Sequence, residues 1–374
     1  MAKVEPRPEI AGMPLWVAGP AGEARAPSIL LASNENPYGP SPRVVEAVAS
    51  RLGGVNRYPE SHPAVLQEAI AARWALRPEQ IVLGSGADQL IRLLALAYLT
   101  PGSTVIAPRP SFPAYALAAR LVGAQLRSVG LTAAGAMDLD AFERAVDAST
   151  RLVFLCSPNN PTGGIADAAD LPAFLSRLAE RGVLTVVDEA YGEFADDDAE
   201  YRSMLTAALA QDIPTVVLRT FSKAYGLAGL RIGWAAAPAD AADALRRVRE
   251  PFAVNGLAHA AAAAAWADTD WRDEVVARTR RTRAAFMAAV AARHLTAFPS
   301  HTNFVAVTCH PDTAAVTAAF LAEGIQVRPT DAFGLPAHIR VTMGTDGEMA
   351  AFWPALDAVD RLLPFPRRPH AGPG

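Results

Sequence analysis

The chain has few cysteines and little net charge for its length. Only two of its 374 residues are cysteines, Cys156 and Cys309, and each lies in or at the end of an apolar stretch. Neither has a second cysteine at a metal-binding spacing, so the sequence predicts buried reduced thiols and excludes a disulfide framework and a metal site. A formal net charge of −4 argues against a nucleic-acid partner.

Long apolar runs are also missing. The N-terminal segment Met-Ala-Lys-Val-Glu-Pro-Arg-Pro lacks the apolar centre of a secretory signal, and no run reaches the length of a membrane span. The alanine run 260–265 is short, and the helix propensity of alanine accounts for it. We therefore expect a cytoplasmic protein with no membrane partner. With 51% hydrophobic residues, 374 residues suffice for two domains.

The most informative stretch runs from Arg219 to Gly233 and contains a Ser-Lys pair, Ser222 and Lys223. It follows Thr215 to Leu218, a β-branched apolar run that predicts a buried strand. Lys223 thus lies just beyond the carboxyl end of a strand, where open α/β sheets bind ligands. A lysine amine with a lowered pKa can form a Schiff base with a carbonyl compound.

Two further predicted strands end in polar residues. Residues 183–187 lead into Asp-Glu-Ala-Tyr, which begins at Asp188, and residues 151–156 lead into Ser-Pro-Asn-Asn-Pro-Thr-Gly. Three strands therefore deliver polar groups to one edge of the sheet. A lysine together with an acid for the pyridine nitrogen is what a pyridoxal phosphate site requires.

The motifs Asn-Pro-Thr-Gly, Asp-Glu-Ala-Tyr and Ser-Lys-x-x-Gly-x-x-Gly-x-Arg occur in this order, a specific combination. The chain resembles the fold-type I, class I/II aminotransferases that depend on pyridoxal 5'-phosphate. The resemblance extends to about residue 363. Within that class, residues 33–40 (Ser-Asn-Glu-Asn-Pro-Tyr-Gly-Pro) and 56–59 (Asn-Arg-Tyr-Pro) are similar to histidinol-phosphate aminotransferases and their aromatic aminotransferase relatives.

Alternating strand and helix patterns through Trp234 predict an α/β fold with a mostly parallel sheet. The pattern changes after Trp266, where a long helix, short strands and further helices follow. The resemblance implies a large domain with a seven-stranded sheet and a smaller α+β domain. We expect an irregular arm and part of the small domain at 1–50, the large cofactor-binding domain at 51–265, the small domain at 266–363 and a flexible tail at 364–374.

The glycine-rich turn from Gly84 to Asp88 joins a predicted strand to a helix, and a helix N-terminus of this kind binds phosphate. The resemblance implies a cofactor-phosphate cup that is formed by several groups and completed by a second subunit of a homodimer. Its members are the backbone N–H groups of Ala87 and Asp88, the side chains of Thr220, Ser222 and Arg231, and Tyr58 from the other subunit.

The resemblance also assigns the groups around the cofactor ring. Phe112 is expected to stack on the ring, with Tyr115 as the competing candidate. Asn160 and Tyr191 are expected to bond the ring oxygen, and Asp188 the ring nitrogen. Lys223, Asp188 and Tyr191 are therefore the expected catalytic residues.

Substrate contacts follow in the same way. Arg340 matches the clamp for an α-carboxylate, such as that of the co-substrate glutamate, whose keto form is 2-oxoglutarate. Arg328 matches the residue that contacts a distal phosphate or carboxylate, and Asn36 is expected to line the same pocket. The family arm commonly carries a tyrosine where this chain has Trp16. Histidinol phosphate is the favoured amino donor, phenylalanine is the alternative, and a decarboxylase such as threonine-phosphate decarboxylase is more distant.

Overall fold

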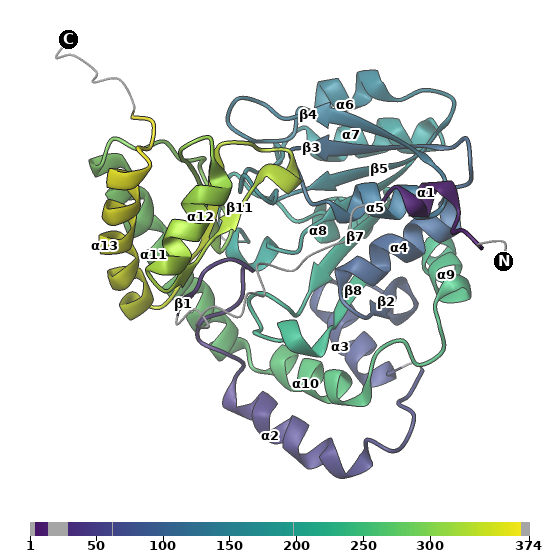
Figure 1. Ribbon diagram of the computed structural model, residues 1–374. Helices are drawn as coiled ribbons and strands as arrows, with labels where there is room; N and C mark the ends of the chain where they lie inside the picture. Colours follow the sequence, from purple (N-terminus) through teal and green to yellow (C-terminus); the bar gives the residue numbers. More distant parts are fainter. Residues whose placement is uncertain (1–3, 14–28, 62, 197, 368–374) are drawn as a thin grey trace.

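The structure is a computed structural model, which describes residues 4–13, 29–61, 63–196 and 198–367. A larger α/β part and a smaller α+β part lie side by side (Figure 1). Each part has its own apolar core. This arrangement is the α/β fold that the alternating pattern predicts.

The larger part is built on a seven-stranded sheet. Strand β8 runs antiparallel to both of its neighbours, and the remaining pairs are parallel. This confirms the predicted mostly parallel seven-stranded sheet. In spatial order the strands are β2 (Ile81–Gly84), β8 (Gly233–Ala236), β7 (Thr215–Thr220), β6 (Leu184–Asp188), β5 (Thr150–Cys156), β3 (Thr104–Arg109) and β4 (Gln125–Gly130).

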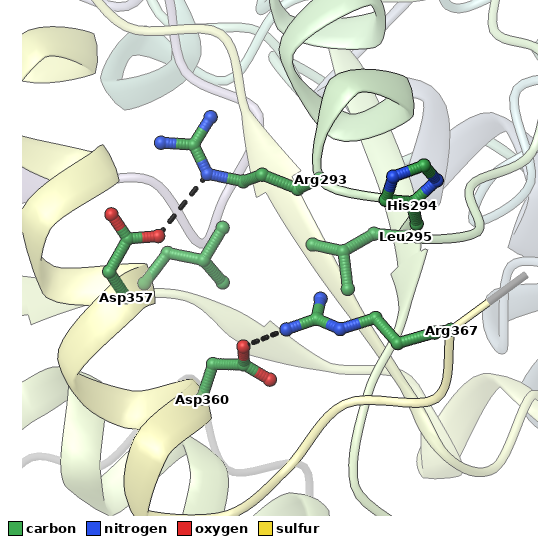
Figure 2. A pocket seen from close by; sticks show the side chains of 7 residues that line it. Arg293, His294, Leu295, Asp357, Asp360 and Arg367 are labelled. Atoms are coloured by element: carbon green, nitrogen blue, oxygen red, sulfur yellow. Dashed lines mark hydrogen bonds and ion pairs between the residues drawn. The ribbon is translucent and has the colours of Figure 1, made fainter.

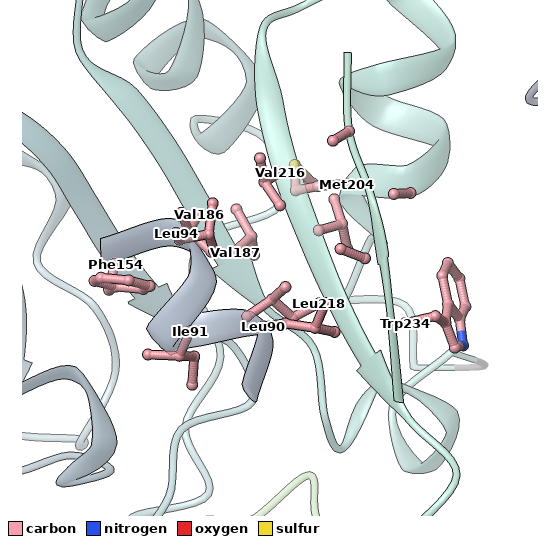
Figure 3. Packing of buried hydrophobic residues seen from close by; sticks show 14 of the residues in the cluster. Leu90, Ile91, Leu94, Phe154, Val186, Val187, Met204, Val216, Leu218 and Trp234 are labelled. Carbon is pink, nitrogen blue, oxygen red and sulfur yellow. The ribbon is translucent and has the colours of Figure 1, made fainter. Parts of the chain in front are cut away.

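Helices cover this sheet, and its central strands are buried accordingly. Figure 3 shows Leu90, Ile91 and Leu94 of α4 packed towards Val187 of β6 and Leu218 of β7. The helices of this part are α2 (Pro42–Arg51), α3 (Ala64–Arg73), α4 (Ala87–Tyr98), α5 (Ala114–Leu121), α6 (Leu139–Ala145), α7 (Leu171–Glu180), α8 (Met204–Ala207), α9 (Ala239–Val248) and α10 (Gly256–Ala267).

The smaller part combines three helices with two small sheets. Its antiparallel sheet has the order β11 (Arg328–Pro329), β12 (His338–Thr342) and β9 (Phe304–Thr308). The helices are α11 (Thr269–Ala292), α12 (Thr313–Ala322) and α13 (Asp346–Leu362). Near the start of the chain, β1 (Ile29–Leu30) pairs in parallel with β10 (Ile325–Gln326), and Leu31 joins this core.

The N-terminal region departs from the sequence-based expectation in two places. The arm contains one helical turn, α1 (Pro8–Ala11), where we expected irregular structure only, and proline is compatible with a first turn. Helix α2 lies below α10 in Figure 1, and its Val44 belongs to the larger core. By packing, α2 therefore goes with the larger part and not with the arm.

The C-terminal segment is packed further than expected. Phe365 is buried in the smaller core and Arg367 forms a β-bridge with Leu295, although we expected a flexible tail from residue 364. Figure 2 shows Arg367 paired with Asp360, and Arg293 with Asp357, around a cavity of about 270 Å³. Both arginines are thus already neutralised by acids.

Candidate active site

A cavity of about 280 Å³ lies at the carboxyl ends of β5, β6 and β7 and receives residues from both parts of the chain. The strand register places Cys156 beside Asp188, and Asp188 beside Leu218, so these three ends meet as predicted. Twelve residues singled out from the sequence line this cavity: Ala87, Asp88, Phe112, Asn160, Asp188, Tyr191, Thr220, Ser222, Lys223, Arg231, Arg328 and Arg340.

Lys223 follows β7 by three residues and reaches across the cavity. Its Nζ donates a hydrogen bond to the Ser33 carbonyl oxygen, at 3.2 Å. Burial, followed by the nearby positive charge of Arg340, lowers the pKa of this amine to about 8. A substantial fraction of the amine is therefore neutral near physiological pH, which is the form that attacks a carbonyl carbon.

Asp188 is the last residue of β6 and is only 3% exposed. Its Oδ2 accepts a hydrogen bond from the Tyr115 hydroxyl at 2.8 Å, and its Oδ1 accepts one from the Ala190 N–H at 3.0 Å. Burial raises the pKa of this carboxyl to about 6, since water no longer solvates the charged form. A cationic N–H partner in the cavity would stabilise the carboxylate.

The two candidate stacking residues occupy different places. Phe112 lines the cavity, whereas Tyr115 is buried beneath it, stacked on Phe154 at a centroid distance of 4.8 Å. Tyr115 donates its hydrogen bond to Asp188 from outside the cavity lining. It therefore holds the carboxyl group in place and is not available to stack on a cavity ligand. The geometry favours Phe112 for that role.

One end of the cavity is suited to an anion. Helix α4 begins at Ala87, and no side chain of the described residues caps its N-terminus, where Gly86 is the N-cap. Gly86 has φ = +76°, and a Cβ added to it would lie 2.5 Å from Arg231 Nη2. This glycine therefore lets the Arg231 guanidinium lie against the turn.

The hydroxyl groups of Thr220 and Ser222 also line the anion-binding end, beside Arg231. Thr220 Oγ1 and Ser222 Oγ are 3.0 Å apart, and both residues are buried. Arg231 Nη2 pairs with Asp88 Oδ2 at 3.1 Å, and both side chains are more than 40% exposed. Exposed pairs of this kind are worth only about 0–1 kcal/mol. Arg231 can therefore exchange this partner for a phosphate.

Arg340 is buried without a carboxylate partner among the residues the structure describes. Its Nη1 donates to Asn160 Oδ1 and its Nη2 to the Ala32 carbonyl oxygen, both at 2.6 Å, while its buried Nε has no partner. Burial lowers its pKa to about 10, because the charged form loses its hydration. A buried guanidinium with a free N–H is well suited to a small anion such as a carboxylate.

Two of the predicted residues that the structure describes, Asn36 and Tyr58, do not line this cavity. Asn36 lines a neighbouring cavity of about 400 Å³, and its Nδ2 donates to the Ala224 carbonyl oxygen. Tyr58 is 83% exposed and stacks on Phe252 at a centroid distance of 4.6 Å, outside the cavity lining. Trp16 lies outside the described residues.

Sequence reasoning overlooked Asn34 and Phe333, both of which line the cavity. The guanidinium carbon of Arg340 lies 5.1 Å from the ring centroid of Phe333, and that of Arg328 lies 5.9 Å from the same centroid. Asn34 belongs to the Ser-Asn-Glu-Asn-Pro-Tyr-Gly-Pro motif, which indicates the family resemblance but assigns no cavity position to this residue. Asparagine tolerates left-handed backbone, so its presence before a turn was a usable signal.

Among the residues that the structure describes, no helix has the length and apolar character needed to cross a bilayer. No group of three or more histidine, cysteine or acidic side chains within the described ranges is arranged to bind a metal ion.

Comparison with known proteins identifies a match over most of the chain. The family model "Aminotransferase class I and II" matches residues 26–356. Histidinol-phosphate aminotransferase of Symbiobacterium thermophilum is 43% identical over 331 residues, which are 88% of this chain and 90% of that protein. Histidinol-phosphate aminotransferase 1 of Cupriavidus pinatubonensis is 40% identical over 355 residues, 94% of this chain and 93% of that protein.

A solved structure agrees in fold. The crystal structure of histidinol-phosphate aminotransferase from Sinorhizobium meliloti in complex with pyridoxal-5'-phosphate superimposes with a TM-score of 0.86 at 30% identity. The match covers 96% of this chain and 99% of that one.

Proposed function

The chain belongs to the class I and II aminotransferases, and we propose that it transfers the amino group of histidinol phosphate to 2-oxoglutarate, with pyridoxal 5'-phosphate as cofactor. The observation that carries this proposal is the joint placement of Lys223, Asp188 and Arg340 in one cavity with an anion-binding end. The names of the similar proteins support the choice of amino donor.

The residues of the cavity fit this cofactor. The uncapped N-terminus of α4 and the guanidinium against Gly86 suit a phosphate group. We assign the phosphate to the N–H groups of Ala87 and Asp88 together with Thr220, Ser222 and Arg231. Phe112 is assigned to the ring face, Asn160 and Tyr191 to the ring oxygen, and Asp188 to the ring nitrogen.

When bound, pyridoxal phosphate supplies an electron-withdrawing ring that stabilises the negative charge left when a proton leaves the substrate Cα. Lys223 would hold the cofactor covalently, and its amine, with its lowered pKa, would serve as the general base for that proton. Asp188 would hold the ring nitrogen, and its carboxylate would favour the protonated form of that nitrogen. Arg340 orients the α-carboxylate of glutamate with its free N–H. Because the amino group is transferred in two separate half-reactions, we expect ping-pong kinetics.

The identity of the amino donor depends on the far end of the pocket. Arg328 is assigned to the phosphate of histidinol phosphate, and it lies beside Phe333 at the cavity wall. Phenylalanine is the second candidate, because Trp16 replaces the family tyrosine and because Phe112 and Phe333 give the cavity aromatic walls.

Single-turnover half-reactions without 2-oxoglutarate distinguish these donors. We expect histidinol phosphate to convert the bound cofactor to its amino form faster than phenylalanine does. The change Arg328→Ala should slow histidinol phosphate about 10-fold or more, as expected for a lost charge-assisted contact, and phenylalanine much less. Equal losses for both donors would contradict the role of Arg328, and release of CO₂ without an acceptor would indicate a decarboxylase.

We further propose a cytoplasmic homodimer in which Tyr58 contacts the cofactor phosphate of the other subunit. Tyr58 and Phe252, which stack on each other, are both exposed, and so are Val45 of α2 and Leu52 and Val55 just after it. Exposed apolar groups of this extent are typical of an interaction surface, which supports the proposal.

A further inference from the structure

Asn34 lies in the wall of the cavity in an unusual backbone conformation. It is 1% exposed and has φ = +54°, in the left-handed region where non-glycine residues are uncommon. Its side-chain Nδ2 donates a hydrogen bond to the hydroxyl oxygen of Tyr191 at 2.8 Å. The left-handed backbone thus aims the Asn34 amide at the hydroxyl assigned to the cofactor ring.

The orientation of this amide follows from its other contacts. The Asn34 N–H donates to Thr342 Oγ1 at 3.0 Å, and Thr342 Oγ1 lies 3.2 Å from Asn34 Oδ1, to which it donates. The Asn34 carbonyl oxygen accepts a bond from Asn303 Nδ2 at 3.1 Å. In this arrangement Oδ1 accepts from Thr342, and the NH₂ group faces Tyr191.

The consequence for Tyr191 is a defined hydroxyl direction. An amide NH₂ only donates, so the Tyr191 oxygen acts as the acceptor in this pair and must direct its own proton elsewhere. No described residue accepts that proton, and Tyr191 lines the cavity. Burial raises the pKa of Tyr191 well above its ordinary value, so the proton stays on the oxygen.

We propose that Asn34 is a positioning residue that fixes the Tyr191 hydroxyl as a hydrogen-bond donor into the cavity, towards the ring oxygen of the cofactor. This inference rests on the proposed function, because that function places the ring oxygen beside Tyr191. A donated bond at this oxygen stabilises its negative charge. It thereby affects both the affinity for the cofactor and the pH at which the bound cofactor changes its absorption.

Two substitutions at Asn34 test the direction of the bond. Asn34→Asp keeps the size and tolerates the same backbone, but a carboxylate accepts the Tyr191 proton and turns the hydroxyl away from the cavity. Asn34→Gly removes the amide without adding charge and without strain at positive φ. Each is made alone and in the Tyr191→Phe background, and the holoenzymes are compared with wild type.

The readouts are the cofactor dissociation constant and the pH titration of the bound cofactor's absorption. We expect Asn34→Asp to weaken cofactor binding by about 2- to 12-fold, the range for one lost hydrogen bond, and to shift the titration in the same direction as Tyr191→Phe. Asn34→Gly should have a smaller effect of the same sign. In the Tyr191→Phe background, Asn34→Gly should change neither readout.

Equal effects of Asn34→Gly with Tyr191 present and absent would overturn the proposal, because Asn34 would then act through general structure and not through the hydroxyl. An equal effect of Asn34→Asp on the cofactor titration in the wild-type and Tyr191→Phe backgrounds would show that the shift comes from the added charge alone. That result would likewise overturn the proposal. Failure of the proposed function is recognised separately. A different amino donor or release of CO₂ would appear in the half-reactions and leave the cofactor readouts at Asn34 intact, and a wild-type protein that bound no pyridoxal phosphate would refute the cofactor assignment itself.

Discussion

Arg340 Nη1 donates a hydrogen bond of 2.6 Å to Oδ1 of Asn160, which joins β12 of the smaller part to the loop after β5 of the larger part. Arg340→Lys places all its donors on a single nitrogen, which cannot reach Asn160, Ala32 and a substrate carboxylate at once as the spread nitrogens of a guanidinium can. We expect kcat/KM for glutamate to fall by about 10- to 150-fold, corresponding to the loss of one charge-assisted contact. Half-reaction kinetics with glutamate measure this.

The matched control is Arg293→Lys, at an arginine that is paired with Asp357 in the smaller part and lies outside the cavity. It should leave glutamate kinetics unchanged. Wild-type rates in Arg340→Lys would show that Arg340 contacts no substrate carboxylate.

The rate at which Lys223 attaches to the cofactor should depend on pH as its lowered pKa dictates. The charged amine predominates below about pH 8 and the neutral amine above it, so the rate of covalent attachment should rise through about pH 8 and not near 10.5. Arg340→Gln should move this midpoint upwards, because it removes a positive charge that lowers the pKa. Stopped-flow absorbance after pyridoxal phosphate is added to cofactor-free protein gives the profile.

Borohydride reduction followed by peptide mapping provides the control for the attachment site. The label should lie on Lys223 and be lost in Lys223→Ala, together with turnover. A label on another lysine would disprove the assignment.

The ionised form of the buried Asp188 carboxyl should destabilise the cofactor-free protein, although the same group is needed for the reaction. Its folded-state pKa of about 6 is above the ordinary value. Between about pH 4 and 6 the folded state therefore binds more protons than the unfolded state. The contribution of this group to folding stability is present below that window and is lost as the pH rises through it. Asp188→Asn should therefore raise the melting temperature relative to wild type more at pH 7.5 than at pH 4. The same change should strongly reduce turnover while leaving the cofactor attached.

A stability difference that is the same at both pH values would mean that the buried carboxyl does not titrate in this range. Near-normal turnover in the same variant would leave Asp188 with a structural role only.

Gly86→Ala should weaken cofactor retention through Arg231. The added Cβ would lie 2.5 Å from Arg231 Nη2 and push the guanidinium off the turn. Gly182→Ala is the matched control, because Gly182 has φ = +71° but no atom within 4 Å of an added Cβ. Both variants should lose about 1 kcal/mol of stability from backbone strain, and only Gly86→Ala should raise the cofactor dissociation constant.

Mixing two defective subunits tests the shared site. In a mixed dimer of Tyr58→Phe and Lys223→Ala subunits, the site that contains Lys223 would receive an intact Tyr58 from its neighbour. We expect wild-type cofactor affinity in the minority of sites formed in this way, measured after co-refolding of the two variants. If Tyr58 served its own subunit, mixing would create no intact site.

The sequence predicted the residues that follow regular strands better than those that depend on contacts between distant segments. Asp188 ends β6, and Lys223 and Asn160 lie within four residues of the ends of β7 and β5, so the parallel order of these three strands was sufficient to predict that they meet. The support of Asp188 by Tyr115 depends on how α5 packs under the sheet, which no local pattern encodes.

The overlooked residues have the same explanation. Asn34 reaches Tyr191 only because its backbone is left-handed and is held by Thr342 and Asn303, which are 308 and 269 positions away in the chain. Asn36, two residues later in the same motif, points into the neighbouring cavity instead. A motif can therefore indicate a family without indicating which of its side chains enter the site.

The pairing of β1 with β10 has a consequence for the order of events during protein synthesis. Ile29 lies opposite Ile325, so the strand that leads into Ser33 and Asn34 has no partner until most of the chain has left the ribosome. All strands of the large sheet end by Ala236 and can pair well before that point. We conclude that the cavity is completed after the large sheet, because Asn34 and Arg340 are brought to it only once β10 and β12 have been synthesised.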